Sequence, residues 1–237
     1  MVSQAKILGV NIDIVTWAEI VRFCKQALVQ AAPQMITTIN GEIILIATKN
    51  PSYKKVLNTA NLAIADSTNV VWMGRLKGFK FPYRTPGSEL FWEICEIAED
   101  MKKSVYFLGG AENTAQLTAE KVQERFPALE IAGFSNADPS EQTALEVRKK
   151  NPDVVFVAYG APVQELWIAQ NKDKITAKIM VGVGGTFDMV SGKLRRAPDW
   201  MLKMHLEWLW RLYLQPKRII RIFKAVIIFP IRVLFSS

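Results

Sequence analysis

The chain has 237 residues, half of them hydrophobic, and a formal net charge of +8, so it is long enough for one sizeable core. The N-terminus lacks a charged stretch followed by an unbroken apolar run, and no segment has about 18 consecutive apolar residues. We therefore expect neither secretion nor a membrane-spanning helix. Cys24 and Cys95 lie far apart without metal-ligand spacing, which favours buried free thiols in a reducing compartment.

Short β-branched runs alternate with longer helical patterns along the chain. We predict strands at 6–14, 34–39, 61–65, 104–108, 129–134, 153–158 and 177–183. We predict helices at 16–30, 41–59, 68–77, 87–101, 112–125, 140–150, 163–171 and 199–235. Such alternation produces βαβ units. The sequence thus predicts an α/β protein with a Rossmann-like, mostly parallel sheet covered by helices.

The positive charge is concentrated at the C-terminal end. Residues 1–188 contain 20 basic and 20 acidic side chains, whereas residues 189–237 contain 10 basic side chains against Asp199 and Glu207. From residue 199, apolar and aromatic residues recur at helical spacing with Arg and Lys between them. We therefore divide the chain into an α/β core, 1–198, and a basic amphipathic helical appendage, 199–237, that can lie on an anionic membrane.

The end of the third predicted strand carries a single acid, Asp66. Ligands of open α/β sheets bind beyond the carboxyl ends of the strands, so residues at these ends are candidate site residues. As a general base, a carboxylate in such a crevice can take a proton from a hydroxyl nucleophile. The plainer alternative is that Asp66 only caps the helix that follows it.

The segment TTINGE, residues 37–42, lies at another strand end. Thr38 and Asn40 are ordinary turn and cap residues, yet at the same sheet edge they could bind a sugar or orient Asp66. Glu42 is more typical of a solvated or capping acid than of a catalytic one.

Two strand ends carry paired glycines before a predicted helix, Gly109–Gly110 and Gly184–Gly185. Backbone amides at a helix N-terminus can hold a phosphate, and glycine lets the ligand approach closely. Paired glycines are also common at such turns for steric reasons alone. Neither G-x-G-x-x-G nor the P-loop pattern occurs, which disfavours dinucleotide and P-loop sites.

Gln164 and Glu165 follow Pro162 at the start of a predicted helix. Gln164 could hydrogen-bond a sugar or base, whereas Glu165 could simply complement the helix dipole. The only histidine, His205, has no partner at ligand spacing, so we expect no zinc site. Asp-x-Asp is absent from the sequence, so the charge of a bound diphosphate would be balanced by arginines and not by a metal ion.

Five ordered motifs give the chain a family resemblance: TxNxE, Asp66, GxPxQExW, GGxFDxxxGxxxRAP and ExWxxRxxxxPxR. With them the sequence resembles the WecG/TagA/CpsF glycosyltransferases (family 26) from about residue 7 to residue 223. One departure lies beside the acid, where Ser67 replaces the usual glycine.

The resemblance implies a metal-independent, inverting enzyme without a cofactor. Such enzymes typically transfer N-acetylmannosamine or its uronic acid from a UDP-sugar donor to N-acetylglucosamine on a polyprenyl diphosphate acceptor, peripherally on the inner face of the cell membrane. The family's base falls on Asp66, and its other pocket residues fall on Thr38, Asn40, Arg84 and Gln164. Its diphosphate-binding arginines correspond to Arg211, Arg218 and Arg221. Candidate membrane contacts are Lys217, Ile219, Ile220, Ile222, Phe223 and Lys224.

Two other classes of function stay open at this stage. The basic, aromatic C-terminal end could bind nucleic acid, although its aromatic residues recur with packing periodicity and its charge does not continue onto the α/β core. The chain could also be a non-catalytic membrane-interaction protein. The sequence leaves open whether the working form is a monomer or a small homo-oligomer.

Overall fold

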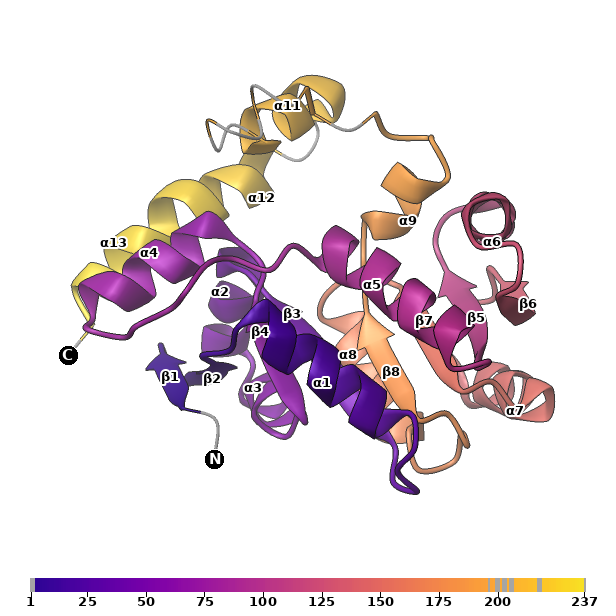
Figure 1. Ribbon diagram of the computed structural model, residues 1–237. Coiled ribbons are helices and arrows are strands. Elements are labelled where there is room, and N and C mark those ends of the chain that lie inside the picture. Colours follow the sequence, from indigo (N-terminus) through magenta and orange to yellow (C-terminus); the bar gives the residue numbers. More distant parts are fainter. Residues whose placement is uncertain are drawn as a thin grey trace.

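The computed structural model describes residues 3–195, 197–198, 201, 204, 207–216 and 219–236, without the side chains of Glu207 and Arg211. Six parallel strands form the main sheet in the order β4–β3–β8–β7–β5–β6 (Figure 1). The strands are β3 (Gln34–Ile39), β4 (Leu62–Ala65), β5 (Ser104–Gly109), β6 (Glu130–Ser135), β7 (Val154–Ala158) and β8 (Ile179–Gly182). The predicted α/β architecture is confirmed.

Helices cover both faces of this sheet (Figure 1). One face carries α1 (Trp17–Ala27), α5 (Gly87–Asp100), α6 (Thr114–Arg125) and α9 (Thr186–Val190). The other carries α2 (Gly41–Lys49), α3 (Pro51–Asn58), α7 (Glu141–Lys150) and α8 (Val163–Asn171). Successive residues of a strand point to opposite faces of the sheet: Ile179 and Val181 of β8 pack into one hydrophobic cluster and Met180 packs into another. Strands buried on both faces therefore read as continuous apolar runs.

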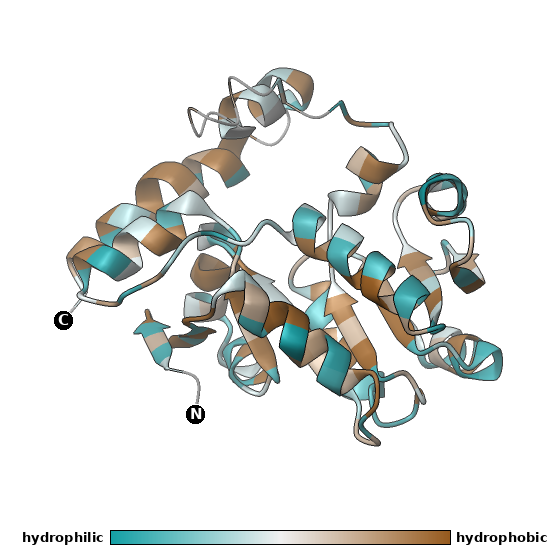
Figure 2. Cartoon of the chain, viewed as in Figure 1, coloured by the Kyte–Doolittle hydropathy of each residue, from teal (hydrophilic) through white to brown (hydrophobic). Residues whose placement is uncertain are grey.

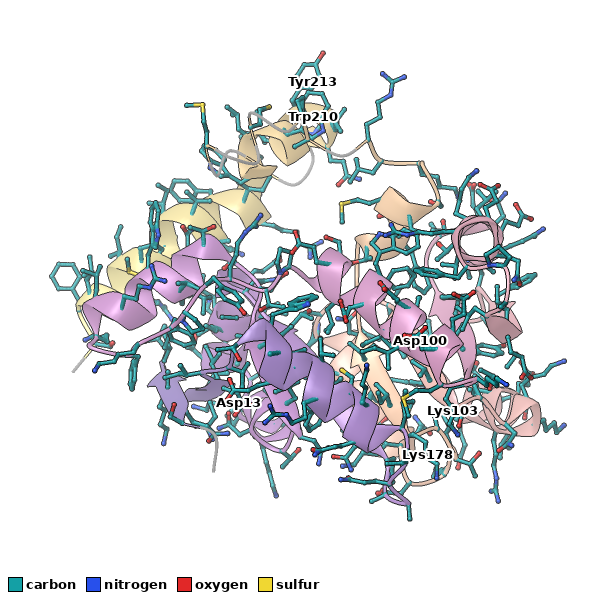
Figure 3. The ribbon with its side chains drawn as sticks, viewed as in Figure 1. Asp13, Asp100, Lys103, Lys178, Trp210 and Tyr213 are labelled. Atoms are coloured by element: carbon teal, nitrogen blue, oxygen red, sulfur yellow. The ribbon has the colours of Figure 1, made fainter. Side chains whose placement is uncertain are left out.

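The predicted strand at 6–14 is wrong, because the segment forms a hairpin of β1 (Gln4–Ile7) and β2 (Val10–Asp13). Its turn residues Leu8 and Gly9 both have positive φ, 49° and 85°, the combination that a two-residue hairpin loop of type I′ requires. Asp13, labelled in Figure 3, accepts a hydrogen bond from the backbone N–H of Ala63 at 2.7 Å. This bond attaches the hairpin to β4.

The single helix predicted at 41–59 is divided into α2 and α3. Asn50 has extended backbone angles, accepts a hydrogen bond from Tyr53 N, and precedes Pro51 at the first position of α3. Proline disfavours helical geometry in the residue before it and is well suited to the first turn of a helix. The division follows from that local chemistry.

The predicted helix at 199–235 is also interrupted. Helix α11 (Glu207–Leu214) ends before Gln215–Pro216, and a second helical stretch consists of α12 (Ile219–Phe223), the π-helical turn η2 (Lys224–Ile228) and α13 (Phe229–Leu234). We call this stretch, 219–234, the C-terminal helix. Its Phe229 and Val233 are buried in the same cluster as residues of α2 and of α4 (Thr68–Leu76). The C-terminal helix therefore contributes side chains to the core, and its separation as an appendage stays a prediction.

Candidate active site

The carboxyl ends of the parallel strands meet at one edge of the sheet. Asp66 follows β4, Asn40 follows the adjacent β3, Gly184 follows β8 after one residue, and Gly109 ends β5. The candidate residues from different strands therefore lie together at the C-terminal ends of the strands, the side of the sheet where ligands of such folds bind.

Asp66 is partly exposed and is held from two sides. Its backbone N–H donates to Ile39 O at 2.8 Å, and its Oδ1 accepts from the backbone N–H of Gly87, the first residue of α5, at 2.7 Å. The cap of the following helix α4 is Ser67, whose hydroxyl accepts from Val70 N at 3.4 Å. Capping of α4 by Asp66 is therefore wrong. Its carboxylate instead lies at the N-terminus of α5, which favours negative charge.

Thr38 lies beside Asp66 across Gly87. A Cβ added to Gly87 would lie 3.3 Å from Thr38 Cγ2 and 3.6 Å from Asp66 Oδ1. Thr38 is buried, and its hydroxyl donates to Gly182 O of β8 at 3.3 Å. Thr38 therefore joins the ends of β3 and β8 while its methyl group packs near the carboxylate. Gly87 was not among the predicted site residues, because only the fold brings α5 to this edge.

Asn40 caps α2: its Oδ1 accepts from Ile43 N at 3.1 Å. The ordinary role considered for this residue is therefore present, and a role toward substrate stays a prediction. Arg84 is half-buried and precedes Thr85, whose N–H donates to Ala65 O at 2.7 Å. The segment of Arg84 thus runs beside the end of β4, next to Asp66.

Gln164 is the centre of a buried hydrogen-bond network. Its Oε1 accepts from the backbone N–H groups of Gly160, 3.0 Å, and Gly184, 3.1 Å. Its Nε2 donates to Glu165 Oε1 at 2.7 Å, and Tyr53 donates its hydroxyl to Glu165 Oε2 at 2.9 Å. Gln164 thereby fixes the loops that follow β7 and β8.

Glu165 is fully buried, so it is not the surface acid that a dipole role would suggest. Burial raises the pKa of its carboxyl above 4.5, while the hydrogen bonds from Gln164 and Tyr53 lower it part of the way. Burial, together with the nearby Glu165 carboxylate, raises the pKa of Tyr53 far above neutrality. Tyr53 was missed at the sequence level, since nothing in the spacing of residues 53 and 165 connects them.

The two glycine turns differ. Gly109 and Gly110 have φ of 94° and 81°, and their carbonyls accept from Asn136 Nδ2 at 3.0 and 3.2 Å. Gly185 precedes α9, which has only five residues, and the amide of Gly184 is bonded to Gln164. The Gly184 amide thus already has a partner within the protein, and a nucleotide role for either glycine turn stays a prediction.

Of the three C-terminal arginines, only the side chain of Arg221 lies within the described residues; Arg218 and the side chain of Arg211 lie outside them, as does Lys217. Arg221 Nε donates to Glu42 Oε1 at 2.6 Å, forming an ion pair. Glu42 is two residues beyond Asn40, so this pair attaches the C-terminal helix to the sheet edge. In the described part of the chain, no three His, Cys, Asp or Glu side chains are grouped closely enough to hold a metal ion.

The membrane candidates lie mostly on the surface. Ile219, Ile220, Phe223 and Lys224 are exposed, and Ile222 is half-buried. Figure 2 shows hydrophobic residues along much of the C-terminal helix. On α11, Trp210 and Tyr213 stand near each other, with ring centroids 5.9 Å apart (Figure 3). Within the described ranges, no helix is both long and apolar enough to cross a bilayer.

Comparisons with known proteins identify relatives over nearly the whole chain. The family model described as "Glycosyl transferase WecG/TagA/CpsF family" matches residues 5–237. Three similar proteins all carry the name N-acetylglucosaminyldiphosphoundecaprenol N-acetyl-beta-D-mannosaminyltransferase. The protein of Bacillus subtilis (strain 168) is 34% identical over 82% of this chain and 77% of its own length. That of Bacillus spizizenii is 38% identical over 77% and 72%, and that of Staphylococcus aureus (strain MRSA252) is 31% identical over 96% and 91%.

Proposed function

Because the chain belongs to the WecG/TagA/CpsF family of glycosyl transferases, we propose that it transfers N-acetylmannosamine, or a related sugar, to an N-acetylglucosaminyl-diphospho-polyprenol. The donor is a UDP-sugar, and the product enters cell-wall or surface polysaccharide synthesis, such as that of teichoic acid. The observation that carries the proposal is the partly exposed residue Asp66 at the C-terminal ends of the strands, whose carboxylate accepts a hydrogen bond from Gly87 N–H. The chain is a hexosyltransferase, as its relatives are named.

In this reaction Asp66 acts as the general base. Its carboxylate accepts the proton of the acceptor hydroxyl while the hydroxyl oxygen attacks the anomeric carbon and the bond to UDP breaks. Attack from the face opposite UDP inverts the anomeric centre, so a single carboxylate is sufficient. The hydrogen bond to Gly87 and the neighbouring methyl group of Thr38 support this role, because they restrict the carboxylate to one orientation.

Cationic side chains balance the diphosphate charge in the proposed mechanism. Arg84 lies beside the end of β4, and Arg221 lies at the same edge through its pair with Glu42. Guanidinium groups bind phosphate oxygens with two parallel hydrogen bonds. The absence of Asp-x-Asp from the sequence agrees with transfer that needs no metal ion. In the bound state, the acceptor diphosphate would compete with Glu42 for Arg221.

The acceptor is a lipid, so we also propose that the enzyme works on the inner face of the cell membrane. Exposed Ile219, Ile220 and Phe223, next to Lys224, support peripheral attachment through the C-terminal helix. Removal of residues 199–237 would also remove Phe229 from the core. The double variant Ile220→Glu/Phe223→Glu is therefore the cleaner test, and it should sediment less with anionic vesicles than the wild type does.

The reaction is tested by measuring UDP release from a panel of UDP-sugars with a short-chain N-acetylglucosaminyl-diphospho-lipid in EDTA. We expect acceptor-dependent release with one donor, and loss of that release in Asp66→Asn. Dependence on added divalent cations would contradict the metal-independent mechanism. Binding of UDP without transfer of any sugar would replace the proposal by a non-catalytic membrane protein.

A further inference from the structure

Helix α4 of the α/β body presents apolar side chains beside the C-terminal helix. Trp72 is 51% exposed and Leu76 is 68% exposed, one helical turn apart. Both follow shortly after Asp66 in the chain. The membrane candidates predicted from sequence all lie in the C-terminal helix, so these two side chains are additional to them.

The C-terminal helix has an apolar outer face of its own. Large side chains that are between 43% and 64% exposed recur every three or four residues, on one side of the helix. They are Ile220, Phe223, Ile227, Ile231 and Leu234. The buried Phe229 and Val233 occupy the opposite side, so this outer face is not required for packing.

The two helices are joined to each other. Asn69 of α4 donates its Nδ2 to Ala225 O in the π-helical turn at 3.2 Å, and Lys77, just after α4, donates to the carbonyl of Ser236. Figure 1 shows α4 running alongside α13, and the two helices are in contact. Their exposed apolar side chains therefore belong to one continuous part of the surface.

The charged side chains that these two segments contribute all have the same sign. Neither the segment 68–80 nor the segment 219–236 contains an aspartate or glutamate. Their basic residues are Arg75, Lys77, Lys80, Arg221, Lys224 and Arg232. Apolar side chains with basic residues around them complement the interfacial region of an anionic bilayer.

We propose that α4 and the C-terminal helix form one bilayer-docking face, with Trp72 and Leu76 entering the lipid interface next to Ile220 and Phe223. This inference rests on the proposed membrane attachment and extends it to the α/β body. Docking through α4 brings the base to the membrane, because Asp66 directly precedes the cap residue of this helix. The acceptor diphosphate, which is at the lipid surface, then meets the carboxyl edge of the sheet.

A second copy of the chain is a poorer occupant of this face. A symmetric dimer pairs a patch with itself, and here it would place together two copies of segments that contain basic side chains and no Asp or Glu. Like charges that face each other across an interface are unfavourable. The observations therefore favour the bilayer.

The experiment compares vesicle binding of the full-length wild type with that of the double variant Trp72→Ser/Leu76→Ser. The matched control is Val29→Ser/Leu145→Ser, which removes two exposed apolar side chains far from this face. With vesicles of mixed phosphatidylglycerol and phosphatidylcholine, we expect sedimentation of the first variant to weaken about tenfold and that of the control to stay unchanged. Thermal unfolding of all three proteins shows whether they are folded.

Direct contact is tested by tryptophan quenching with brominated lipids, which should decrease in Trp72→Phe. Wild-type vesicle binding by the Ser double variant would overturn the proposal, as would a dimer in solution that this variant dissociates. Activity with a short-chain, water-soluble acceptor separates the docking hypothesis from the proposed transfer reaction. If sugar is transferred and the Ser double variant binds vesicles as the wild type does, the docking face is refuted and the enzyme assignment stays intact. Vesicle binding through α4 without any transfer leaves the docking face intact.

Discussion

The end of β4 and the start of α8 each place one carboxylate near the carboxyl edge of the sheet, in opposite surroundings. Asp66 is partly exposed and is aligned by the backbone N–H of Gly87. Glu165 is fully buried between the side chains of Gln164 and Tyr53. A general base must reach its substrate, whereas an enclosed carboxylate can only orient its neighbours. This difference supports the proposed role of Asp66 in proton transfer, whereas Glu165 positions the loops after β7 and β8 through Gln164.

Asp66→Asn should have the largest effect on turnover. Asparagine keeps an oxygen for Gly87 N–H but cannot accept the proton, so kcat should fall by about 10²- to 10⁴-fold. The free energy of unfolding should change by no more than about 1 kcal/mol. The control is Asp153→Asn at the opposite edge, where the carboxylate accepts from Ser104 N–H at 3.0 Å and pairs with Lys103, labelled in Figure 3. Turnover near the wild-type level in Asp66→Asn would remove the base assignment.

Glu165→Leu should mainly affect stability. It leaves Gln164 Nε2 and the Tyr53 hydroxyl without their acceptor, and each unsatisfied buried group costs about 1–3 kcal/mol. Some of this loss is offset because a buried carboxyl group is removed. We expect earlier chemical denaturation and about a tenfold lower kcat, because the loops held by Gln164 become less ordered. Glu165→Gln keeps an acceptor for Gln164 and should restore most of both quantities; if it were as inactive as Asp66→Asn, Glu165 would be a reacting group.

The buried carboxyl group of Glu165 also predicts how stability depends on pH when wild type is compared with Glu165→Gln. The folded-state pKa of Glu165 is raised above 4.5 by burial, so the folded protein holds this proton more tightly than the unfolded chain. The stabilisation that results is complete below the unfolded pKa and is lost as pH rises through the folded one. The stability of wild type relative to Glu165→Gln should therefore decrease from about pH 4 upward. Denaturant titrations of both proteins across this range measure their free energies of unfolding. An increase with pH in the stability of wild type relative to Glu165→Gln would contradict a raised pKa of Glu165.

The sequence predicted the strands of the main sheet because their burial on both faces produces continuous apolar runs, such as Val154–Ala158. It did not predict the β1–β2 hairpin, because Leu8 adopts a positive φ and leucine is not a residue type that favours this conformation. The break at Asn50–Pro51 carried a signal, a proline after a residue with capping chemistry, that the apolar periodicity of 41–59 outweighed.

The site could be predicted only in part for a related reason. Strand ends are local features, and they led to Asp66, Thr38 and Asn40. The contact of Asp66 with Gly87 joins residues 21 positions apart, and that of Glu165 with Tyr53 joins residues 112 positions apart. Such pairs form only when the helices pack on the sheet, so periodicity and spacing do not contain them.

Gly87→Ala examines the surroundings of Asp66 with a smaller perturbation. The added methyl group would lie 3.3 Å from Thr38 Cγ2, so Thr38 or α5 must shift by a few tenths of an ångström. Such a shift near the carboxylate should lower kcat about three- to tenfold and leave the free energy of unfolding within about 1 kcal/mol of wild type. Ser88→Ala in the same helical turn is the control. An equal loss in both variants would mean that α5 as a whole, and not the contact at Gly87, affects turnover.

Glu42→Gln should have the smallest effect, although Glu42 is a third carboxylate at this edge. Its pair with Arg221 is partly exposed, with side-chain exposures of 24% and 48%, and such pairs contribute up to about 1 kcal/mol. Removal of the negative charge frees Arg221 for the acceptor diphosphate, so KM for the lipid acceptor should fall while kcat stays within about twofold of wild type. Initial rates at varied acceptor concentration separate the two constants. A fall in kcat comparable to that of Asp66→Asn would contradict this minor role and make Glu42 a competing candidate for the base, because glutamine keeps the shape of glutamate but cannot accept the proton.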